Sequence, residues 1–377
     1  MHRGLRNLYL LVSGDCNLDC SYCYAQGGQI SNGPSAMSPD VLRLALEKLV
    51  PHDGSLVISF LGGEPLLELD LLRQAVVLGN ALGAERGTRV RYALTTNGTL
   101  IDEPRRIFLK DHISHLAVSL DGPPALTDAC RRFKSGQGSV GNMVEKNLEY
   151  LRQSGVAFGL RATIAESHAE HLLDAAAYLQ GLSPASLRID AATDAKAWSR
   201  EHWRIWTTQA RQLNRHSFSR LMAGKTNGPL GDIYRAAALR LADEKRHFPC
   251  LAGRGILAVD TAGDAYPCDH FVGEADFRMG NVQDNDFPST DFHRVSERFV
   301  ANGVDHRQRC SACGIRYACG GECPAISLKR QGNIAEPSPN HCTHMRHVLR
   351  DAVTLVDAAL SDPSTRPRIE ALVGMAR

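Results

Sequence analysis

The first half of the chain alternates short apolar runs with segments of helical periodicity. Runs rich in β-branched and apolar residues predict strands at 8–13, 56–62, 90–96, 115–121, 157–164 and 186–191. Apolar residues three or four apart predict helices at 38–50, 66–84, 101–112, 138–154 and 168–181. Six strand–helix repeats predict an α/β fold, a parallel sheet covered by helices, and are too few for an eight-stranded barrel. We therefore expect a partial (β/α)6 barrel with its active site at the carboxyl ends of the strands.

The second half of the chain has a different pattern. Residues 199–224 predict one longer helix, and all three tryptophans, Trp198, Trp203 and Trp206, lie at its start. This aromatic group predicts either a packed anchor between domains or a wall of a substrate site. From about residue 230 the pattern becomes short strands and loops rich in Gly, Pro and Cys, and a helical pattern returns at 345–360. We expect two domains, at 1–230 and 231–377, the second held together by metal more than by a large core.

Composition and charge exclude several classes of protein. A chain of 377 residues with 43% hydrophobic and 22% charged residues is typical of a globular protein. The net charge of +2 and the dispersed basic residues give no indication of a nucleic-acid partner. No apolar run is long enough for a membrane span, and the one near the N-terminus is too short for a signal peptide. A cytoplasmic location and no membrane partner are therefore expected.

The eleven cysteines change this picture through their placement. Three lie at 16–23 and seven at 250–342, with only Cys130 between them. Disulfides are rare in the reducing cytosol, so the two groups predict metal binding. Cys130 lies outside every motif and is expected to be a small buried residue.

The first cysteine group directly follows the first predicted strand. Within "GDCNLDCSYCYA" at 14–25, Cys16, Cys20 and Cys23 are spaced C-x3-C-x2-C. Thiolates select iron–sulfur clusters, zinc or copper(I), but a structural zinc site needs a fourth ligand, which this loop lacks. Three ligands on a four-iron cluster leave one iron open for a chelating cofactor. The spacing, the aromatic Tyr22 before the last cysteine and the place after the first strand resemble the radical SAM enzymes.

The resemblance extends over essentially the whole chain and implies where S-adenosylmethionine (SAM) binds. "GGEP" at 62–65 ends the second predicted strand, "TTNG" at 95–98 the third and "SLDG" at 119–122 the fourth. In the family the first of these loops contacts the SAM amino group, and the others build the rest of the pocket. Arg131 or Arg132 is expected to pair with the SAM carboxylate. The SAM-binding residues implied by the resemblance are Tyr22, Gly62, Gly63, Glu64, Asn97, Ser119 and Arg131.

One glycine motif points to a different cofactor. "GQGSVG" at 136–141 matches G-x-G-x-x-G, but "RRFKS" rather than a strand precedes it, and position 161, where an acid is expected, is Arg. We interpret it as the flexible entry to the helix at 140–154, not as a nucleotide site.

The second cysteine group is longer. Its layout is C-x12-G-x4-C, then C-x2-C-x5-C-x3-C, then one further cysteine. Zinc ribbons are the alternative, because C-x2-C is their usual half-site. The complete pattern resembles the SPASM extension of radical SAM enzymes that modify peptides and proteins.

The SPASM resemblance implies two auxiliary iron–sulfur clusters, expected to be [4Fe-4S]. One would be bound by Cys310, Cys313, Cys319 and Cys342, and the other by Cys250, Cys268 and Cys323. Sulfatase-maturing relatives usually carry an additional cysteine between the positions of Cys250 and Cys268, and this chain has none there. The cluster on Cys250, Cys268 and Cys323 is therefore expected to have three cysteine ligands, with either an open iron or a non-cysteine ligand at the fourth position.

The resemblance also implies the reaction. A reduced cluster on the first three cysteines cleaves SAM, and the resulting 5′-deoxyadenosyl radical removes a hydrogen atom from a bound substrate. Sulfatase maturases have an aspartate that resembles a catalytic base at the position of Asp269, which follows Cys268 directly. A turn aspartate that caps backbone N–H groups is the alternative for Asp269, and His270 has a weaker claim to a role.

Three functions fit these residues, of which the third belongs to a different class from the first two. The first is a radical SAM/SPASM oxidoreductase, a maturase that crosslinks or oxidises residues in a ribosomally made peptide. The second is oxidation of a sulfatase Cys or Ser to formylglycine, and the third is a metal-binding module without catalysis. The first strand begins near residue 8, so no leader-binding domain is expected in front of it. The expected partners are a peptide or protein substrate, a flavodoxin- or ferredoxin-type electron donor and a separate leader-binding protein.

Overall fold

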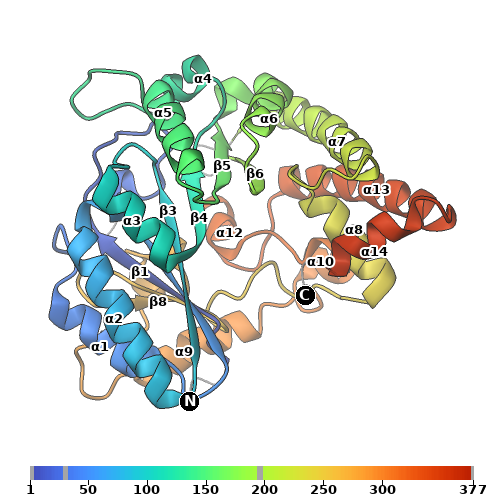
Figure 1. Cartoon of the computed structure of the whole chain (residues 1–377). Coiled ribbons are helices and arrows are strands. Elements are labelled where there is room, and N and C mark those ends of the chain that lie inside the picture. The colour runs from blue at the N-terminus through green and yellow to red at the C-terminus, as the bar shows by residue number, and fades with distance from the viewer. Residues whose placement is uncertain (1–3, 29–32, 193–197, 375–377) are drawn as a thin grey trace. The chain divides into compact units, whose positions relative to one another are not determined.

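A computed structural model of the chain describes residues 4–28, 33–192 and 198–374 (Figure 1). These residues form two compact units that interleave along the chain. Unit 1 comprises residues up to 120, 124–161 and 251–301, and unit 2 comprises 121–123, 162–250 and 302–377. The single boundary expected at residue 230 stays a prediction.

The predicted parallel sheet is confirmed. Its strands run in the order β6-β5-β4-β3-β2-β1-β7-β8, and the boundary between the units passes through β5. The first six strands are neighbours in chain order, as expected for a partial barrel and unlike a doubly wound sheet. The strands are β1 (Asn7–Ser13), β2 (Ser55–Gly62), β3 (Arg89–Thr96), β4 (Ile113–Ser119), β5 (Gly159–Ile164), β6 (Ser186–Ala191), β7 (Ile256–Val259) and β8 (Ala265–Tyr266).

Figure 1 shows the connecting helices α1, α2 and α3 beside the sheet, and the residues that α1 buries are all apolar. The first helix begins as the sequence predicts: the side chain of the N-cap Ser38 accepts a hydrogen bond from the Val41 amide, and Pro39 occupies the first turn. The helices of this unit are α1 (Pro39–Leu49), α2 (Leu69–Arg86), α3 (Glu103–His112), α4 (Pro124–Cys130), α5 (Val140–Gln153) and α9 (Thr290–Val300).

One strand of unit 1 comes from far along the chain. β7 pairs in parallel with β1, from Asn7 opposite Ile256 to Leu10 opposite Val259. β8 then pairs with β7 in antiparallel direction and leads directly to Cys268. The cysteine-rich region therefore contributes two strands to the main sheet, which the sequence analysis did not predict.

Unit 2 contains long helices that pack on one another. The core includes Ile233, Ala236 and Ala237 of α8 together with Val356 of α13 and Ile369 of α14. Figure 1 shows α13 alongside α7 and α8. The helices of this unit are α6 (Leu172–Gly181), α7 (Arg200–Met222), α8 (Gly231–Ala242), α10 (Gln308–Ser311), α11 (Arg316–Cys319), α12 (Pro324–Gln331), α13 (Pro339–Ser361) and α14 (Arg366–Gly374).

The sequence analysis predicts short strands and loops from about residue 230 and a helix at 345–360; this helix is confirmed as part of α13, but the chain forms further helices that were not predicted. α8, α9 and α14 lie in this stretch, and α8 and α14 build a hydrophobic core with α13. The tryptophan group packs as an aromatic cluster within unit 2: the ring centroids of Trp198 and Trp203 are 5.5 Å apart, and Trp203 lies 5.6 Å from His344 of α13. None of the described helices has both the length and the apolar surface to cross a membrane.

Candidate functional site

The three-cysteine loop lies at the carboxyl end of β1 and is held by a second backbone segment. Leu18 forms an antiparallel bridge with Phe133. The amides of Asp19 and Ser21 donate to the carbonyls of Arg132 and Cys130, at 2.8 and 2.9 Å. Backbone hydrogen bonds to residues 130–133 therefore fix the conformation of this loop.

The two glycines of "GGEP" allow this loop to pack directly against β2. The Gly63 amide donates to the Ser13 carbonyl at 2.8 Å, and the Glu64 amide donates to the Asp15 carbonyl at 2.7 Å. A Cβ at Gly62 would lie 2.2 Å from the Ser13 oxygen, and a Cβ at Gly63 only 2.0 Å from the Asp15 oxygen. Gly62 also has a positive φ of 129°. Both positions thus require glycine because the two backbones touch.

Glu64 is fully buried and joins the ends of two strands. Its carboxylate accepts hydrogen bonds from the Asn97 amide at 2.7 Å, the Thr96 hydroxyl at 2.8 Å and the Leu66 amide at 3.0 Å. Burial raises the pKa of Glu64 to about 7, although these three donors oppose the shift. In this structure the carboxylate is committed to the protein frame, so its predicted role with SAM stays a prediction.

Asn97 connects the end of β3 to the cysteine loop. Its amide nitrogen donates to the Cys16 sulfur at 3.6 Å and to the Asn17 side chain at 2.8 Å. Asn17 in turn donates to the Thr99 hydroxyl at 2.8 Å. The sequence analysis missed Asn17 and Thr99, whose only signal was a place beside a cysteine and beside "TTNG".

Two further N–H groups point at the sulfurs of the loop. The Leu18 amide donates to the Cys16 sulfur at 3.4 Å, and the Gly27 amide donates to the Cys23 sulfur at 3.3 Å. Burial raises the pKa of the Cys16 thiol, whereas the Leu18 and Asn97 donors lower it. Donors aimed at sulfur stabilise a thiolate, so the loop fits an iron–sulfur cluster.

The remaining residues expected at SAM lie at the same end of the sheet. Ser119 ends β4, half-buried and in register with Arg161 of β5. The guanidinium of the buried Arg131 lies 5.4 Å from the centre of the Tyr22 ring, a cation–π contact, while Arg132 is exposed. The roles of Tyr22, Ser119 and Arg131 stay predictions.

The aspartate after Cys268 contacts the cysteine loop through a tyrosine. The Tyr24 hydroxyl donates to Asp269 at 2.6 Å, and the Tyr24 ring stacks on His270 at a centroid distance of 4.1 Å. Burial, followed by the negative charge of Asp269, raises the pKa of Tyr24 well above its usual value, so the hydroxyl stays protonated. Tyr24 is thus a further site candidate, although nothing in the sequence marked its contact with Asp269.

A different aspartate caps the turn in this region. Asp260, between β7 and β8, accepts hydrogen bonds from the amides of Ala262 and Asp264 at 3.0 and 2.9 Å. Burial raises its pKa to about 6. This capping interaction fixes the hairpin that leads to Cys268.

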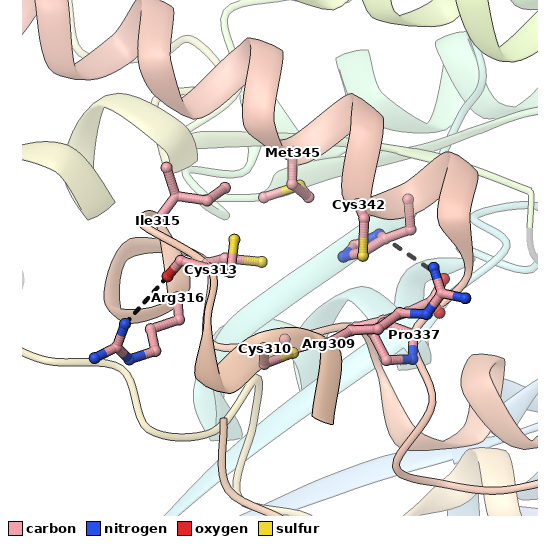
Figure 2. A pocket seen from close by; sticks show the side chains of 12 residues that line it. Arg309, Cys310, Cys313, Ile315, Arg316, Pro337, Cys342 and Met345 are labelled. Atoms are coloured by element: carbon pink, nitrogen blue, oxygen red, sulfur yellow. Dashed lines mark hydrogen bonds and ion pairs between the residues drawn. The ribbon is translucent and has the colours of Figure 1, made fainter. Parts of the chain in front are cut away.

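The second cysteine group borders a cavity in unit 2. Four of its thiols, those of Cys310, Cys313, Cys319 and Cys342, lie around this cavity, together with apolar side chains such as Ile315 and Met345. Figure 2 shows that Cys310, Cys313 and Cys342 border the same cavity. Cys310 and Cys313 come from the segment around α10, and Cys342 comes from α13. Burial raises the pKa of Cys319 and of Cys342 to about 11.

The buried carboxylate of Glu322, which borders this cavity, connects two other segments of the chain by hydrogen bonds. Glu322 accepts hydrogen bonds from the Ser338 amide at 2.6 Å, the Ser338 hydroxyl at 2.8 Å and the Ser327 hydroxyl at 3.2 Å. Ser338 is the N-cap of α13, the helix that carries Cys342. The position of Cys342 is therefore linked to the segment between Cys319 and Cys323, in which Glu322 lies.

The remaining three cysteines are divided between the units. Cys268 belongs to unit 1, whereas Cys250 and Cys323 belong to unit 2, so their grouping around one cluster stays a prediction. Cys130 is buried, as expected, and its carbonyl accepts from the Ser21 amide. Among residues 4–28, 33–192 and 198–374, no three His, Cys, Asp or Glu side chains converge in a way that could hold a single metal ion.

The comparisons with known proteins agree with this arrangement. Residues 10–170 match the radical SAM superfamily, and residues 250–314 match SPASM, an iron–sulfur cluster-binding domain. SAM and iron–sulfur clusters are the cofactors of these domains. The matched regions contain the three-cysteine loop and much of the second cysteine group.

Relatives of the chain differ in the reaction that their names give. A serine-type anaerobic sulfatase-maturating enzyme of Klebsiella aerogenes is 26% identical, over 84% of this chain and 79% of that protein. An AdoMet-dependent heme synthase of Oleidesulfovibrio alaskensis is 25% identical, over 88% of this chain and 86% of that protein.

A solved structure shares the fold over nearly the whole length. The protein anSMEcpe with bound AdoMet superposes with a TM-score of 0.81 and 19% identity, covering 99% of each chain. This likeness shows a shared fold, and the two domain matches, over residues 10–170 and 250–314, identify the chain as a radical SAM enzyme with an iron–sulfur cluster-binding SPASM domain.

Proposed function

We propose that this enzyme oxidises or crosslinks a residue within a ribosomally made peptide, with Asp269 as the group that accepts the proton. The observation that carries the proposal is the 2.6 Å hydrogen bond from Tyr24, next to the last cysteine of the first loop, to Asp269, next to Cys268. It places a carboxylate beside the loop that would hold the SAM cluster.

The predicted residues have distinct tasks in this reaction. Cys16, Cys20 and Cys23 would hold the cluster that binds SAM, and Asn97 with the Leu18 amide would stabilise its Cys16 thiolate. When bound, SAM and the iron–sulfur clusters supply the acceptors for one hydrogen atom and one electron of the substrate.

Asp269 would complete the oxidation. Loss of a hydrogen atom and an electron from a C–H and its neighbouring N–H, O–H or S–H group leaves one proton to be removed. The Asp269 carboxylate accepts it, while the Tyr24 hydroxyl donates to its Oδ2 and fixes its orientation. Tyr24 itself keeps its proton, since burial raises its pKa.

The second candidate is conversion of a sulfatase Cys or Ser to formylglycine. The same Tyr24–Asp269 pair and the sulfatase-maturating relative of K. aerogenes favour it. The absence of a cysteine between Cys250 and Cys268 favours the first candidate, because sulfatase maturases usually carry one there.

An anaerobic assay with SAM and a reductant distinguishes the two. The candidate substrates are small peptides encoded beside the gene and a peptide with a sulfatase modification sequence, each followed by mass spectrometry. We expect loss of two hydrogens from a small precursor without a new aldehyde. A hydrazide-reactive aldehyde in the sulfatase peptide would establish the second candidate. Turnover of a porphyrin but of neither peptide would overturn both.

An Asp269→Asn variant tests the role of this residue. It keeps an oxygen that accepts from Tyr24 but cannot take up a proton. We expect SAM cleavage to continue while product formation falls at least about 100-fold, the range of general-base effects. An unchanged product yield would remove Asp269 from the mechanism.

A further inference from the structure

Arg307 is a fully buried cation in unit 2, and among the described residues none of its hydrogen bonds goes to a carboxylate. Its side chain is 2% exposed. The guanidinium Nε donates to the backbone and side-chain oxygens of Asn302 at 3.1 and 2.9 Å, and Nη1 donates to the Glu322 carbonyl at 3.1 Å. All three acceptors are neutral. Among the described residues, Nη2 has no hydrogen-bond partner.

Such a charge is costly unless something compensates it. A guanidinium does not lose its proton near neutral pH, and an unpaired charge in the interior costs several kcal/mol. The nearby carboxylate of Glu322 is directed elsewhere, to Ser338 and Ser327. The protein groups seen around Arg307 therefore do not account for its burial.

The guanidinium of Arg307 lies against the backbone between Cys319 and Cys323, one cysteine from each predicted auxiliary set, where Nη1 donates to the Glu322 carbonyl. Burial lowers the pKa of Arg307, and Coulomb attraction to Cys310, Cys250, Cys319 and Cys323 opposes the shift. Cys310 and Cys319 border the cavity of the first set, while Cys250 and Cys323 belong to the second set. Gly321 leaves room for this guanidinium, because a Cβ there would lie only 2.7 Å from Nη1.

We infer that Arg307 is a shared positive counter-ion of the two auxiliary iron–sulfur clusters and raises the reduction potentials of both. A cluster with thiolate ligands is anionic, and reduction adds one more negative charge. A fixed positive charge therefore stabilises the reduced form more than the oxidised form, and a free N–H donor near the cluster acts in the same direction. This inference rests on the proposed assignment of these cysteines as cluster ligands.

The test compares auxiliary potentials in a background that lacks the first cluster. Cys16, Cys20 and Cys23 are all replaced by Ala, so that the remaining iron–sulfur signals in electron paramagnetic resonance come from the downstream cysteines. Anaerobic redox titration is then repeated with Arg307→Met, Arg307→Lys and Arg309→Met. Arg309 is the matched control because it also lies beside Cys310 but is half-exposed and paired with Glu336.

We expect Arg307→Met to lower the ratio of reduced to oxidised auxiliary cluster at least tenfold at a fixed potential, about 59 mV for one electron. Arg307→Lys and Arg309→Met should shift it much less. Unchanged potentials in Arg307→Met would overturn the inference. If Arg307→Met fails to retain iron, retention by Arg307→Lys supports a role of charge, and loss from both variants overturns it.

This experiment separates the inference from the proposals on which it rests. It uses no substrate, so its result is independent of whether the enzyme modifies a peptide. A background variant without any bound iron would instead refute the cysteine assignment, and with it the role of Arg307.

Discussion

The two cysteine regions are built in different ways. The loop at 16–23 is a single short segment, held by a backbone ladder with residues 130–134 and by close packing on Gly62 and Gly63. The cavity of unit 2 takes its thiols from separate segments around α10, α11 and α13. The first region is organised by the sheet beside it, whereas the second brings together buried thiols.

The thiols of the two regions share one property, because burial raises the pKa of Cys16 and, to about 11, the pKa of Cys319 and Cys342. Without metal these thiols therefore stay protonated. The regions differ in that metal would join separate segments of the chain, around α10, α11 and α13, only in the second region. We infer that metal binding contributes more to the folding of unit 2 than to that of unit 1. The following predictions test this contrast, from the largest expected effect to the smallest.

Removal of one cysteine from the first loop should abolish turnover without unfolding the protein. In Cys16→Ala the cluster loses a ligand, so we expect no 5′-deoxyadenosine above background by liquid chromatography, while the downstream cysteines still bind iron. Cys130→Ala is the matched control, because Cys130 is buried beside the same loop but belongs to no motif. Deoxyadenosine from Cys16→Ala at the normal rate would refute the assignment of the loop.

Removal of one cysteine from the second region should instead destabilise unit 2. Cys342→Ala takes a thiol from α13, and we expect loss of iron and of several kcal/mol of stability, since metal binding contributes directly to folding. Hydrogen exchange should accelerate in α8, α13 and α14 more than in β1–β4. Equal acceleration in both units would contradict the contrast drawn above.

Asn97 should have an intermediate effect, confined to the first region. Asn97→Ala removes the donor to Cys16 and Asn17, each bond contributing about 1 kcal/mol. We expect SAM cleavage to slow roughly tenfold, a barrier increase of about 1.4 kcal/mol, while iron content stays normal. Asn142→Ala, at an exposed position in α5, is the control and should not change the rate.

The smallest effect concerns pH and the β7–β8 turn. The pKa of Asp260 rises from 3.8 to about 6 on folding, so its contribution to stability is full below pH 3.8 and is lost as the pH rises through 6. Asp260→Asn retains an oxygen for both amide donors and removes the charge. At pH 8 we expect it to be more stable by up to about 3 kcal/mol in thermal unfolding. This difference in stability should shrink as the pH falls from 6 toward 4. A difference that does not vary with pH would refute the raised pKa of Asp260.

The sequence predicts the elements that have strong periodicity. All six strands of the first half and the helices between them form where expected, because β-branched runs and capped amphipathic helices are local signals. The chain after residue 230 is predicted less well. Helix α8 has no side-chain N-cap and buries mainly alanines, so its apolar face does not stand out. β7 has only four residues and forms through its pairing with β1.

The candidate site also combines features that the sequence predicts with contacts that it does not. Cysteine spacing is local and visible in the sequence, and the glycines of "GGEP" indicate a close approach, although they face the Ser13 and Asp15 backbone. Contacts between distant residues leave no such signal. The Tyr24–Asp269 hydrogen bond spans 245 positions, and Arg307 is one of 43 Lys and Arg residues in the sequence. Only the folded chain distinguishes it as a buried cation.

The pairing of β7 with β1 has a practical consequence for dissecting this enzyme. β1 lies between β2 and β7, so a chain truncated at residue 230 would leave one side of β1 without a partner. An open, apolar strand edge of this kind pairs readily with other chains and promotes aggregation. The SAM half should therefore be produced together with residues 251–301, because these residues complete its sheet.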